Sequence, residues 1–541
     1  MCIHFERNAH LTAQLCNMGH NITVSYESMV DLDIFRLCRE FFDAGNLIAD
    51  KEIEDFMNKY LTDDALEIKR RSTIIGFLSV NTESKNLIQS IIEEYRNLSQ
   101  CLSDLDRGPR PLLTYAQMLH AMEAYTASVE LMCTLFLSKE STASVITEIS
   151  DVIVDVKNSP FFAKVQICLL QVKKLLQPLS NLTLAVNISE SGEAVQISIT
   201  DINSGSEQLV GMFSGSKENI NSLCDVAPIK LRSPYSYLEG YILEQVEKRL
   251  ATQLNAALRV LKQIDINILR EWYDWLAPMD LYYKGLLFVN KLKQYNCQLC
   301  QPNPSHGIFE AEDMGYPHLV LTGYKPVPQA FHFSLGDTIM ITGANSSGKT
   351  SALKSFAQNS ILAQLGFWVP ARLFRFHPYK QWLTIFSAGE DLQMRASRFQ
   401  QEAEQMNMVT QIASHDTCML FNEPFTSTNP DEAAALMCDI IIKLSKKKTT
   451  LLLVTHIYDI YELLDRSNLT FIRSFVTGIQ FDADKVKYTY TLEEKEPDGL
   501  SYARLLADEY GFSIDKMLIN TDEMKELKNF MMEGNDSETK K

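Results

Sequence analysis

The sequence predicts a multidomain chain in which a mainly α-helical domain with a small β tip precedes an α/β domain. Its 541 residues are too many for one compact core and correspond to about two to four domains. Up to about residue 315, apolar residues recur at helical spacing, with one interruption of β-like alternation. Beyond that point, short continuous apolar strands alternate with helical segments, which is the pattern of a parallel sheet covered on both faces.

The helical part begins at about Ser28. Apolar side chains repeat every three or four residues to about Arg107, where Gly108-Pro-Arg-Pro111 ends the pattern. A long helix is predicted over residues 112–137, and another apolar-rich stretch runs from Ser141 to about Leu179.

A small β hairpin and two long helices are predicted next. Residues 182–188 and 194–200 alternate and are rich in β-branched residues, with a plausible turn between them. Helix returns after Ser233-Pro234, since proline is favoured in the first helical turn, and is predicted over 235–263 and 268–295. Two long helices on either side of a small β tip in the sequence predict an elongated, lever-like domain. An ordinary helical bundle with one β insertion is the alternative, and these segments do not decide between the two.

Charge and composition restrict the class of protein. Lys and Arg number 51 and Asp and Glu number 68, so the net charge of −17 excludes a uniformly basic nucleic-acid coat but not a local basic groove. No apolar run approaches the ~20 residues that cross a bilayer, and the N-terminus lacks a secretion signal. Eleven scattered cysteines favour free thiols in a reducing compartment. We therefore expect a cytoplasmic protein with no membrane partner.

The segment that carries chemistry is Gly343-Ala-Asn-Ser-Ser-Gly-Lys-Thr350. It follows a predicted strand over residues 338–342 and precedes a predicted helix over 351–365, which is the context that a phosphate-binding loop requires. Its glycines let the backbone wrap around phosphates, and the helix N-terminus favours negative charge. Lys349 would neutralise the β- and γ-phosphates, and the Thr350 hydroxyl would bind Mg²⁺. A Gly/Ser-rich turn that caps a helix is the alternative.

Two further strand ends supply candidates for hydrolysis. Asn422-Glu423 follows a predicted strand over 418–421, where such sites usually carry an Asp that holds Mg²⁺ and a Glu that polarises the attacking water. Asn422 keeps a carbonyl acceptor without the charge, and Glu423 keeps the base role. His456 follows a predicted strand over 450–455 and is a candidate contact of the γ-phosphate, although a single histidine after a strand is more often structural.

Taken together, these motifs resemble the DNA mismatch-repair MutS family, a branch of the ATP-binding-cassette-like ATPases. The similarity is specific from about residue 335 to 505 and weaker over about 28–515. The matching stretches, in order, are 341–350, 363–371 (Ala-Gln-Leu-Gly-Phe-Trp-Val-Pro-Ala), Glu390 to Glu402 with Ser397, 422–428, Thr455-His456 and 498–503. Upstream, residues 64–71 resemble the start of the family's core domain, and the two helices around 233–292 resemble its lever helices.

The resemblance implies domains and residue roles. It implies a lead-in over 1–27, a helical core and lever domain over 28–315 with a reduced clamp at about 180–225, a P-loop ATPase domain over 316–515, and a C-terminal helix and tail over 516–541. The catalytic residues would be Glu423, His456 and Lys349. ATP would be bound by Gly343, Asn345, Ser346, Ser347, Gly348, Lys349, Thr350 and Ser351 of one subunit and by Ser397 of the other, with Mg²⁺ on Thr350 and Asn422.

The chain departs from the family pattern at three positions. Ser347 replaces a glycine of the phosphate loop, Arg395 replaces the signature glycine, and Asn422 replaces the metal-directed Asp. These changes leave ATP binding possible, whereas loss of that carboxylate is expected to slow hydrolysis by orders of magnitude. Fewer than about 30 residues precede the lever core, so we expect no room for the family's mismatch reader and expect recognition of DNA structure instead.

Two functions from different classes follow. The first is an ATP-dependent DNA-binding clamp, a homodimer that acts on double-stranded or branched DNA in mismatch repair or recombination, together with other repair proteins. The second is an ATP-gated interaction protein that hydrolyses slowly and regulates a partner. Asn422 and Arg395 favour the second, and Lys349, Glu423 and His456 favour the first. A cassette ATPase unrelated to DNA is a third possibility, which the lever-like helices disfavour.

Overall fold

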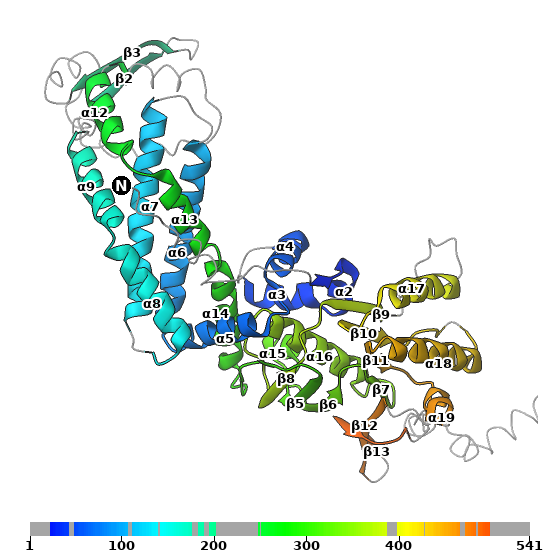
Figure 1. Ribbon diagram of the computed structural model, residues 1–541. Helices are drawn as coiled ribbons and strands as arrows, with labels where there is room; N and C mark the ends of the chain where they lie inside the picture. Colours follow the sequence, from blue (N-terminus) through cyan, green and yellow to red (C-terminus); the bar gives the residue numbers. More distant parts are fainter. Residues whose placement is uncertain are drawn as a thin grey trace, which may run out of the picture. The chain divides into compact units, whose positions relative to one another are not determined.

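The computed structural model describes residues 22–42, 48–105, 111–138, 141–175, 182–188, 194–201, 247–248, 250–386, 398–426, 428–465, 471–482 and 485–497. These residues fall into two compact units (Figure 1). The first unit contains the described residues from Glu83 to Asp280, and the second contains those up to Thr82 and from Leu281 onward. The remainder of the predicted clamp, from residue 202 to about 225, the helix start at Ser233-Pro234 and the segment at 498–503 lie outside the described residues.

The first unit is a helical bundle with one antiparallel β pair. Its central helix α7 (Pro111–Leu137) has 27 residues, about 40 Å at 1.5 Å per residue. Around α7 pack the other helices, each of which contacts it: α6 (Ser84–Leu105), α8 (Ser144–Lys157), α9 (Pro160–Leu175), α12 (Ala251–Leu261) and α13 (Ile266–Leu276). The Trp272 indole of α13 donates to the Ser128 hydroxyl of α7 at 2.8 Å and stacks on Trp275, so the bundle is tied together by a buried hydrogen bond as well as by apolar packing.

The predicted β tip is confirmed as a strand pair. Strands β2 (Leu182–Ile188) and β3 (Ala194–Asp201) pair antiparallel, with Leu182 opposite Asp201. The turn between them lies outside the described residues.

The prediction of one continuous helix over residues 268–295 is wrong. Helix α13 ends at Leu276, and α14 (Met279–Gln294) begins after Ala277 and Pro278. Proline has no N–H to donate to the preceding turn, and it disfavours the α conformation of the residue before it, so the helix breaks at this point. The signal was local and could have been read from the sequence.

The second unit is built on a seven-stranded, mainly parallel sheet, which confirms the α/β prediction and its three named strands. The strand order is β1-β9-β10-β11-β7-β12-β13, and the register is parallel except between the last two strands. The bounds are β1 (Thr23–Val24), β7 (Thr338–Thr342), β9 (Gln381–Phe386), β10 (Thr417–Asn422), β11 (Thr450–Val454), β12 (Ile472–Asp482) and β13 (Lys485–Glu494).

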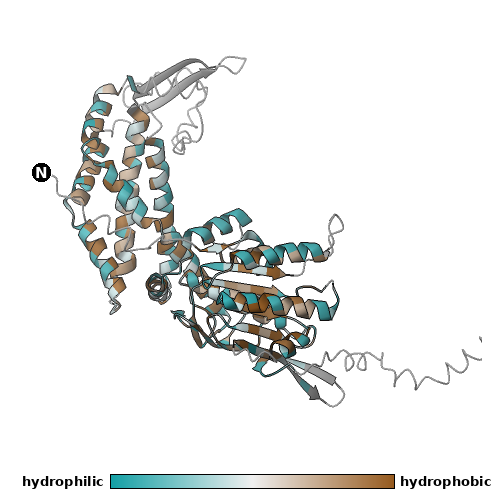
Figure 2. Ribbon diagram, turned by 45° about the vertical axis from the view of Figure 1, so that its right-hand side comes forward, coloured by the Kyte–Doolittle hydropathy of each residue, from teal (hydrophilic) through white to brown (hydrophobic). Residues whose placement is uncertain are grey.

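Helices cover both faces of this sheet, as its continuous apolar strands predict. Leu451 and Leu453 of β11 belong to one core cluster with α18 (Pro430–Lys446), whose neighbours are α17 (Arg398–Ile412) and α19 (Asp459–Asp465). On β9, Trp382 contacts Phe356 of α16 (Lys349–Gln364) with ring centroids 6.0 Å apart, while its neighbour Leu383 joins the α18 cluster. Because successive strand residues point to opposite faces, α16 and α18 lie on opposite sides. Figure 2 shows hydrophobic colours on the strands between them.

A second sheet and the N-terminal helices complete this unit. The four strands are ordered β4-β8-β5-β6, with bounds β4 (Asn303–Pro304), β5 (Ile308–Met314), β6 (Gln329–Ser334) and β8 (Leu373–Phe376). The remaining helices are α2 (Tyr26–Asp31), α3 (Ile34–Phe42), α4 (Asp50–Tyr60), α5 (Ala65–Leu78), α14 and α15 (Pro317–Leu321).

The observed units therefore divide the chain differently from the predicted boundary between 315 and 316. Helices α2 to α5, predicted to belong to the core and lever domain, lie in the same compact unit as the seven-stranded sheet, and α2 contacts β9. The Ser28 hydroxyl donates to the carbonyl of Trp382 at 3.3 Å, and the Trp368 indole donates to the carbonyl of Ser72 at 3.0 Å. Helical periodicity identifies a buried face but not the element that covers it, so the assignment required these long-range contacts.

His377, between β8 and β9, makes the stability of this unit sensitive to acid. Its side chain is 7% exposed, neither ring nitrogen makes a hydrogen bond, and Nε2 lies 3.9 Å from Asp416 Oδ1. Burial lowers the pKa of His377 to about 4, against the opposing effect of Asp416. Between pH 6.5 and 4 the unfolded chain therefore binds a proton that the folded chain does not, and stability falls as the pH falls.

We expect His377→Phe to weaken this acid sensitivity. Between pH 7 and pH 5 the free energy of unfolding of the wild type should fall by about 2 kcal/mol more than that of the variant, at about 1.4 kcal/mol per pH unit below 6.5. Urea unfolding at the two pH values measures the difference. Parallel losses in both proteins would show that His377 does not titrate as described.

No described helix is both long and apolar enough to span a membrane.

Candidate nucleotide-binding site

The candidate residues gather at one edge of the parallel sheet. The loop at 343–348 follows β7, Asn422-Glu423 lies at the end of β10, and Thr455-His456 follows β11. Since these three strands are parallel and neighbours in the sheet order, their carboxyl ends meet at the same edge. This is the edge where open α/β sheets place their ligands.

The predicted strand–loop–helix unit is confirmed, and its backbone explains its glycines. Gly343 has φ +135° and Gly348, the N-cap of α16, has φ +95°. A Cβ on Gly343 would lie 1.9 Å from Thr477 Oγ1, so no other residue fits there without displacement of β12. Ser346 also adopts a left-handed φ of +63°. The loop thus doubles back before α16, whose first amides face the loop.

Lys349 is held inside this loop. Its ammonium donates to the carbonyls of Gly343 at 3.0 Å and Ala344 at 2.9 Å, and the side chain is 5% exposed. Burial lowers the pKa of Lys349, and the nearby Glu423 carboxylate counteracts that effect. A buried cation that donates to two neutral carbonyls favours an incoming anion, as the motif predicts.

Ser347, which departs from the family's glycine, lies behind the loop rather than in it. Its hydroxyl donates to the carbonyl of Ala344 at 2.6 Å and lies 2.6 Å from the hydroxyl of Thr477 on β12. The side chain is fully buried, and its polar atom is satisfied. The Ser347 side chain therefore links the loop to β12. The predicted contact of Ser347 with nucleotide would have to come from its backbone amide, and it stays a prediction.

The two predicted metal-directed residues are in contact. The Thr350 hydroxyl donates to Asn422 Oδ1 at 2.9 Å, which joins the start of α16 to the end of β10. Both groups offer a neutral oxygen, the ligand type that Mg²⁺ prefers, but neither brings negative charge. The nearby negative charge is that of the Glu423 carboxylate. The Glu423 backbone has φ +54°, and its N–H donates to the carbonyl of Val454 at 2.8 Å.

The last two predicted residues are His456 and Ser397. His456 is exposed after β11 and does not line the cavity beside the loop. Ser397 lies outside the described residues, which begin again at Arg398 with α17. Their roles stay predictions.

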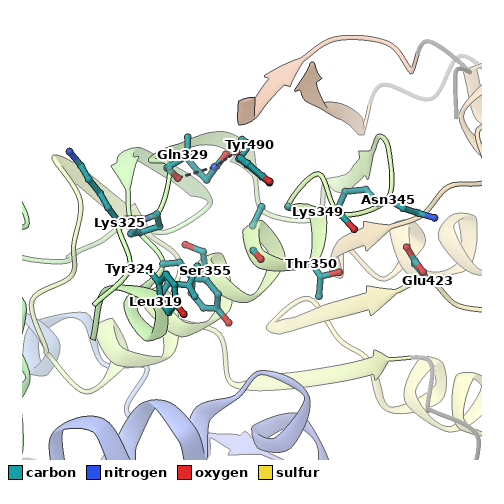
Figure 3. Close-up of a pocket in the computed structure, with 17 residues that line it drawn as sticks. Leu319, Tyr324, Lys325, Gln329, Asn345, Lys349, Thr350, Ser355, Glu423 and Tyr490 are labelled. Atoms are coloured by element: carbon teal, nitrogen blue, oxygen red, sulfur yellow. Dashed lines mark hydrogen bonds between the residues drawn. The ribbon is translucent and has the colours of Figure 1, made fainter. Parts of the chain in front are cut away.

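A cavity of about 710 Å³ opens beside the loop (Figure 3). At one end Figure 3 shows Asn345, Lys349, Thr350 and Glu423, and at the other Leu319, Tyr324 and Lys325. Ser346, Gly348 and Ser351 also line it, so most of the predicted phosphate-binding residues converge on one space.

Several lining residues were not foreseen from the sequence. They are Tyr316, Leu319, Tyr324, Lys325, Pro326, Val327, Gln329, Ala352, Ser355 and Tyr490. Tyr490 of β13 comes within 3.3 Å of where a Cβ on Gly348 would stand, and its carbonyl accepts a hydrogen bond from the Gln329 side chain at 2.6 Å. Its alternating Tyr488-Thr-Tyr490 stretch was the available signal for a strand, but nothing local placed that strand beside the loop.

The arrangement fits a magnesium–nucleoside triphosphate. The cavity volume lies within the range of small-ligand sites, about 300–1,000 Å³. One end offers a buried ammonium and helix-terminal amides for phosphates, and beside it stand the hydroxyl, amide and carboxylate oxygens suited to Mg²⁺. The other end is lined by aromatic and aliphatic side chains, which suit a base.

The chain is similar to known proteins. The family model described as MutS domain V matches residues 339–514. A mitochondrial DNA mismatch repair protein mutS homolog of Sarcophyton glaucum is 26% identical over 195 residues, which is 36% of this chain and 20% of that protein. MutS protein homolog 4 of Mus musculus is 27% identical over 193 residues, which is 35% of this chain and 20% of that protein.

A third relative matches over more residues. Endonuclease MutS2 of Carboxydothermus hydrogenoformans is 24% identical over 286 residues, 51% of this chain and 35% of that protein. The matched part thus spans about one fifth to one third of the length of these curated relatives.

Proposed function

This chain is a member of the MutS family, and from that premise we propose that it is an ATP-dependent DNA-binding protein of mismatch repair or recombination. The observation that carries the proposal is the phosphate-binding loop joined to the end of β10 by the Thr350–Asn422 hydrogen bond beside a nucleotide-sized cavity. The proposal of DNA binding rests on the family resemblance and on relatives named as mismatch repair proteins.

The proposed roles follow from the groups that the site offers. Lys349 would exchange its two carbonyl partners for phosphate oxygens, and the amides of residues 346–350 would donate to the same phosphates. Thr350 and Asn422 would hold Mg²⁺, which when bound offsets the negative charge of the triphosphate. Glu423 would accept a hydrogen bond from the attacking water and orient it.

The helical unit would act as the lever. Its support is the 27-residue helix α7, the helices that pack against it and the β pair, which are the parts expected of a long arm with a tip. In the proposed dimer, Ser397 of each subunit would contact the γ-phosphate in the other, and closure on ATP would move the levers around DNA. We keep the homodimer and the reduced clamp at β2–β3 as parts of this proposal.

Nucleotide and DNA titrations test the proposal. We expect purified chain to bind ATP with Mg²⁺ in calorimetry and Lys349→Ala to bind at least about tenfold more weakly, since it loses a charge-assisted contact to phosphate. Lys443→Ala, which removes an exposed lysine of α18, is the matched control. Homoduplex, mismatched and four-way-junction DNA should then be compared with and without ATP at several salt concentrations. No affinity for ATP would refute the proposal.

A second function is favoured by one observation. The residue that accepts the hydrogen bond from the Thr350 hydroxyl is Asn422, whose side chain is a neutral amide. The site would therefore bind nucleotide but lack one negative charge that promotes hydrolysis. An ATP-gated regulatory protein would bind ATP but turn it over no faster than its Glu423→Gln variant. Single-turnover hydrolysis by the two proteins, with and without DNA junctions, separates the functions.

A further inference from the structure

The loop after β10 has an unusual backbone. Glu423 has φ +54° and Phe425 has φ +59°, with Pro424 between them. A left-handed conformation costs a residue other than glycine about 1–2 kcal/mol, so surrounding contacts must hold this loop in shape. At the first residue of the loop, the Glu423 N–H donates to the carbonyl of Val454 at 2.8 Å.

Helix α17 holds the other end of the loop. The Glu402 carboxylate accepts a hydrogen bond from the backbone N–H of Phe425 at 2.9 Å. The Phe399 ring, one turn earlier on the same helix, lies 5.9 Å from the Phe425 ring between centroids. Both contacts of α17 thus converge on one residue of the loop.

Glu402 is an unexpected residue to find buried. Its side chain is only 7% exposed, whereas Glu404 on the same helix is exposed. Burial of a carboxylate is costly unless hydrogen bonds to it compensate. A carboxylate is a stronger acceptor for a backbone N–H than a neutral group is, so Glu402 is well suited to hold a strained peptide in place.

From these contacts we propose that Glu402 is a positioning residue for ATP hydrolysis, which acts on Glu423 through Phe425. The connection is short and stiff because Pro424 has a fixed φ and joins the two left-handed residues directly. Glu402 does not line the cavity, so its effect falls on the orientation of Glu423 and not on nucleotide contacts. This inference rests on the proposed function and extends it to a residue outside the cavity.

The positioning role and a merely structural role predict different results. If Glu402 orients Glu423, its removal slows the chemical step and leaves ATP affinity unchanged, because misplacement of a reacting group by about 1 Å can cost up to about 100-fold in rate. If Glu402 only stabilises α17, removal lowers the unfolding midpoint and leaves the single-turnover rate of the folded protein unaltered.

The experiment compares Glu402→Ala, Glu402→Gln and the control Glu404→Gln in the full chain. We measure the affinity for ATP with Mg²⁺ by calorimetry, single-turnover hydrolysis at saturating ATP, and the thermal midpoint. We expect Glu402→Ala to hydrolyse at least about tenfold more slowly with ATP affinity within about threefold of wild type. Glu402→Gln keeps an oxygen acceptor and should keep most of the rate, and Glu404→Gln should match wild type.

Phe399→Ala provides a second approach in case Glu402→Ala does not fold. Phe399 is 36% exposed, and its replacement by Ala removes only the ring contact with Phe425. We therefore expect a smaller loss of hydrolysis rate, about threefold, at unchanged ATP affinity. A wild-type rate in Glu402→Ala, or a parallel loss of rate and affinity, overturns the proposal. So does wild-type hydrolysis no faster than that of Glu423→Gln. Failure to bind ATP at all would instead refute the proposed function.

Discussion

Replacement of Asn422 by Asp is expected to increase Mg²⁺-dependent ATP hydrolysis by about 10- to 100-fold. Asn422 already receives the Thr350 hydroxyl at 2.9 Å, so an Asp of nearly the same shape would keep that hydrogen bond and add a negative charge where the metal is expected. The gain comes from charge stabilisation in a partly water-excluded site, where each such interaction contributes several kcal/mol. Single-turnover hydrolysis over a range of Mg²⁺ concentrations measures it.

Two observations make this test decisive. The Mg²⁺ concentration for half-maximal rate should fall in Asn422→Asp, because a carboxylate binds the ion more tightly than an amide oxygen does. Asn422→Leu, similar in size but without an acceptor, should lower the rate below wild type. If Asn422→Asp is no faster than wild type at any Mg²⁺ concentration, Asn422 is not at the metal position.

Replacement of Gly343 by Ala is expected to destabilise the protein by more than about 3 kcal/mol and to abolish ATP binding. Two costs combine, since φ is +135° and the new Cβ would stand 1.9 Å from Thr477 Oγ1. Thr477 cannot simply turn away, because its hydroxyl is engaged with Ser347 at 2.6 Å. Urea unfolding and calorimetric ATP titration measure the two effects.

Gly307→Ala is the matched control for this variant. Gly307 also has a positive φ, +88°, but no atom lies within 4 Å of the position of its Cβ. It should therefore show only the backbone cost, about 1–2 kcal/mol, with normal ATP affinity. Equal losses of stability in the two variants would mean that β12 does not crowd the loop as described.

The phosphate-binding loop shows how much of the site was predictable. Gly343, Gly348, Lys349 and Thr350 could be assigned from their spacing between a strand and a helix, because the conformational needs of such a loop are local. In the structure, Gly348, Lys349 and Thr350 line the cavity. The carbonyl of Gly343 accepts a hydrogen bond from Lys349. The packing of the Ser347 side chain behind the loop was not predictable, because it depends on Thr477, 130 residues later in the chain.

The helices show the same limit. Their positions followed from apolar spacing. The placement of α2 to α5 in the same compact unit as the seven-stranded sheet did not, since it depends on contacts such as Ser28 with Trp382, 354 residues apart. The break at Pro278 is different in kind, because a local signal was present and predicted a boundary.

By itself, the sequence determined the element types, the strands of the parallel sheet and the phosphate-binding loop, because backbone conformation and apolar periodicity depend on neighbouring residues. The tertiary structure alone decided which helices accompany the sheet, that Tyr490 lies beside Gly348, and that Glu402 holds Phe425. These features arise when side chains distant in sequence are packed together, and the free energy of such contacts is set by complementary shape and hydrogen bonding that no local pattern records.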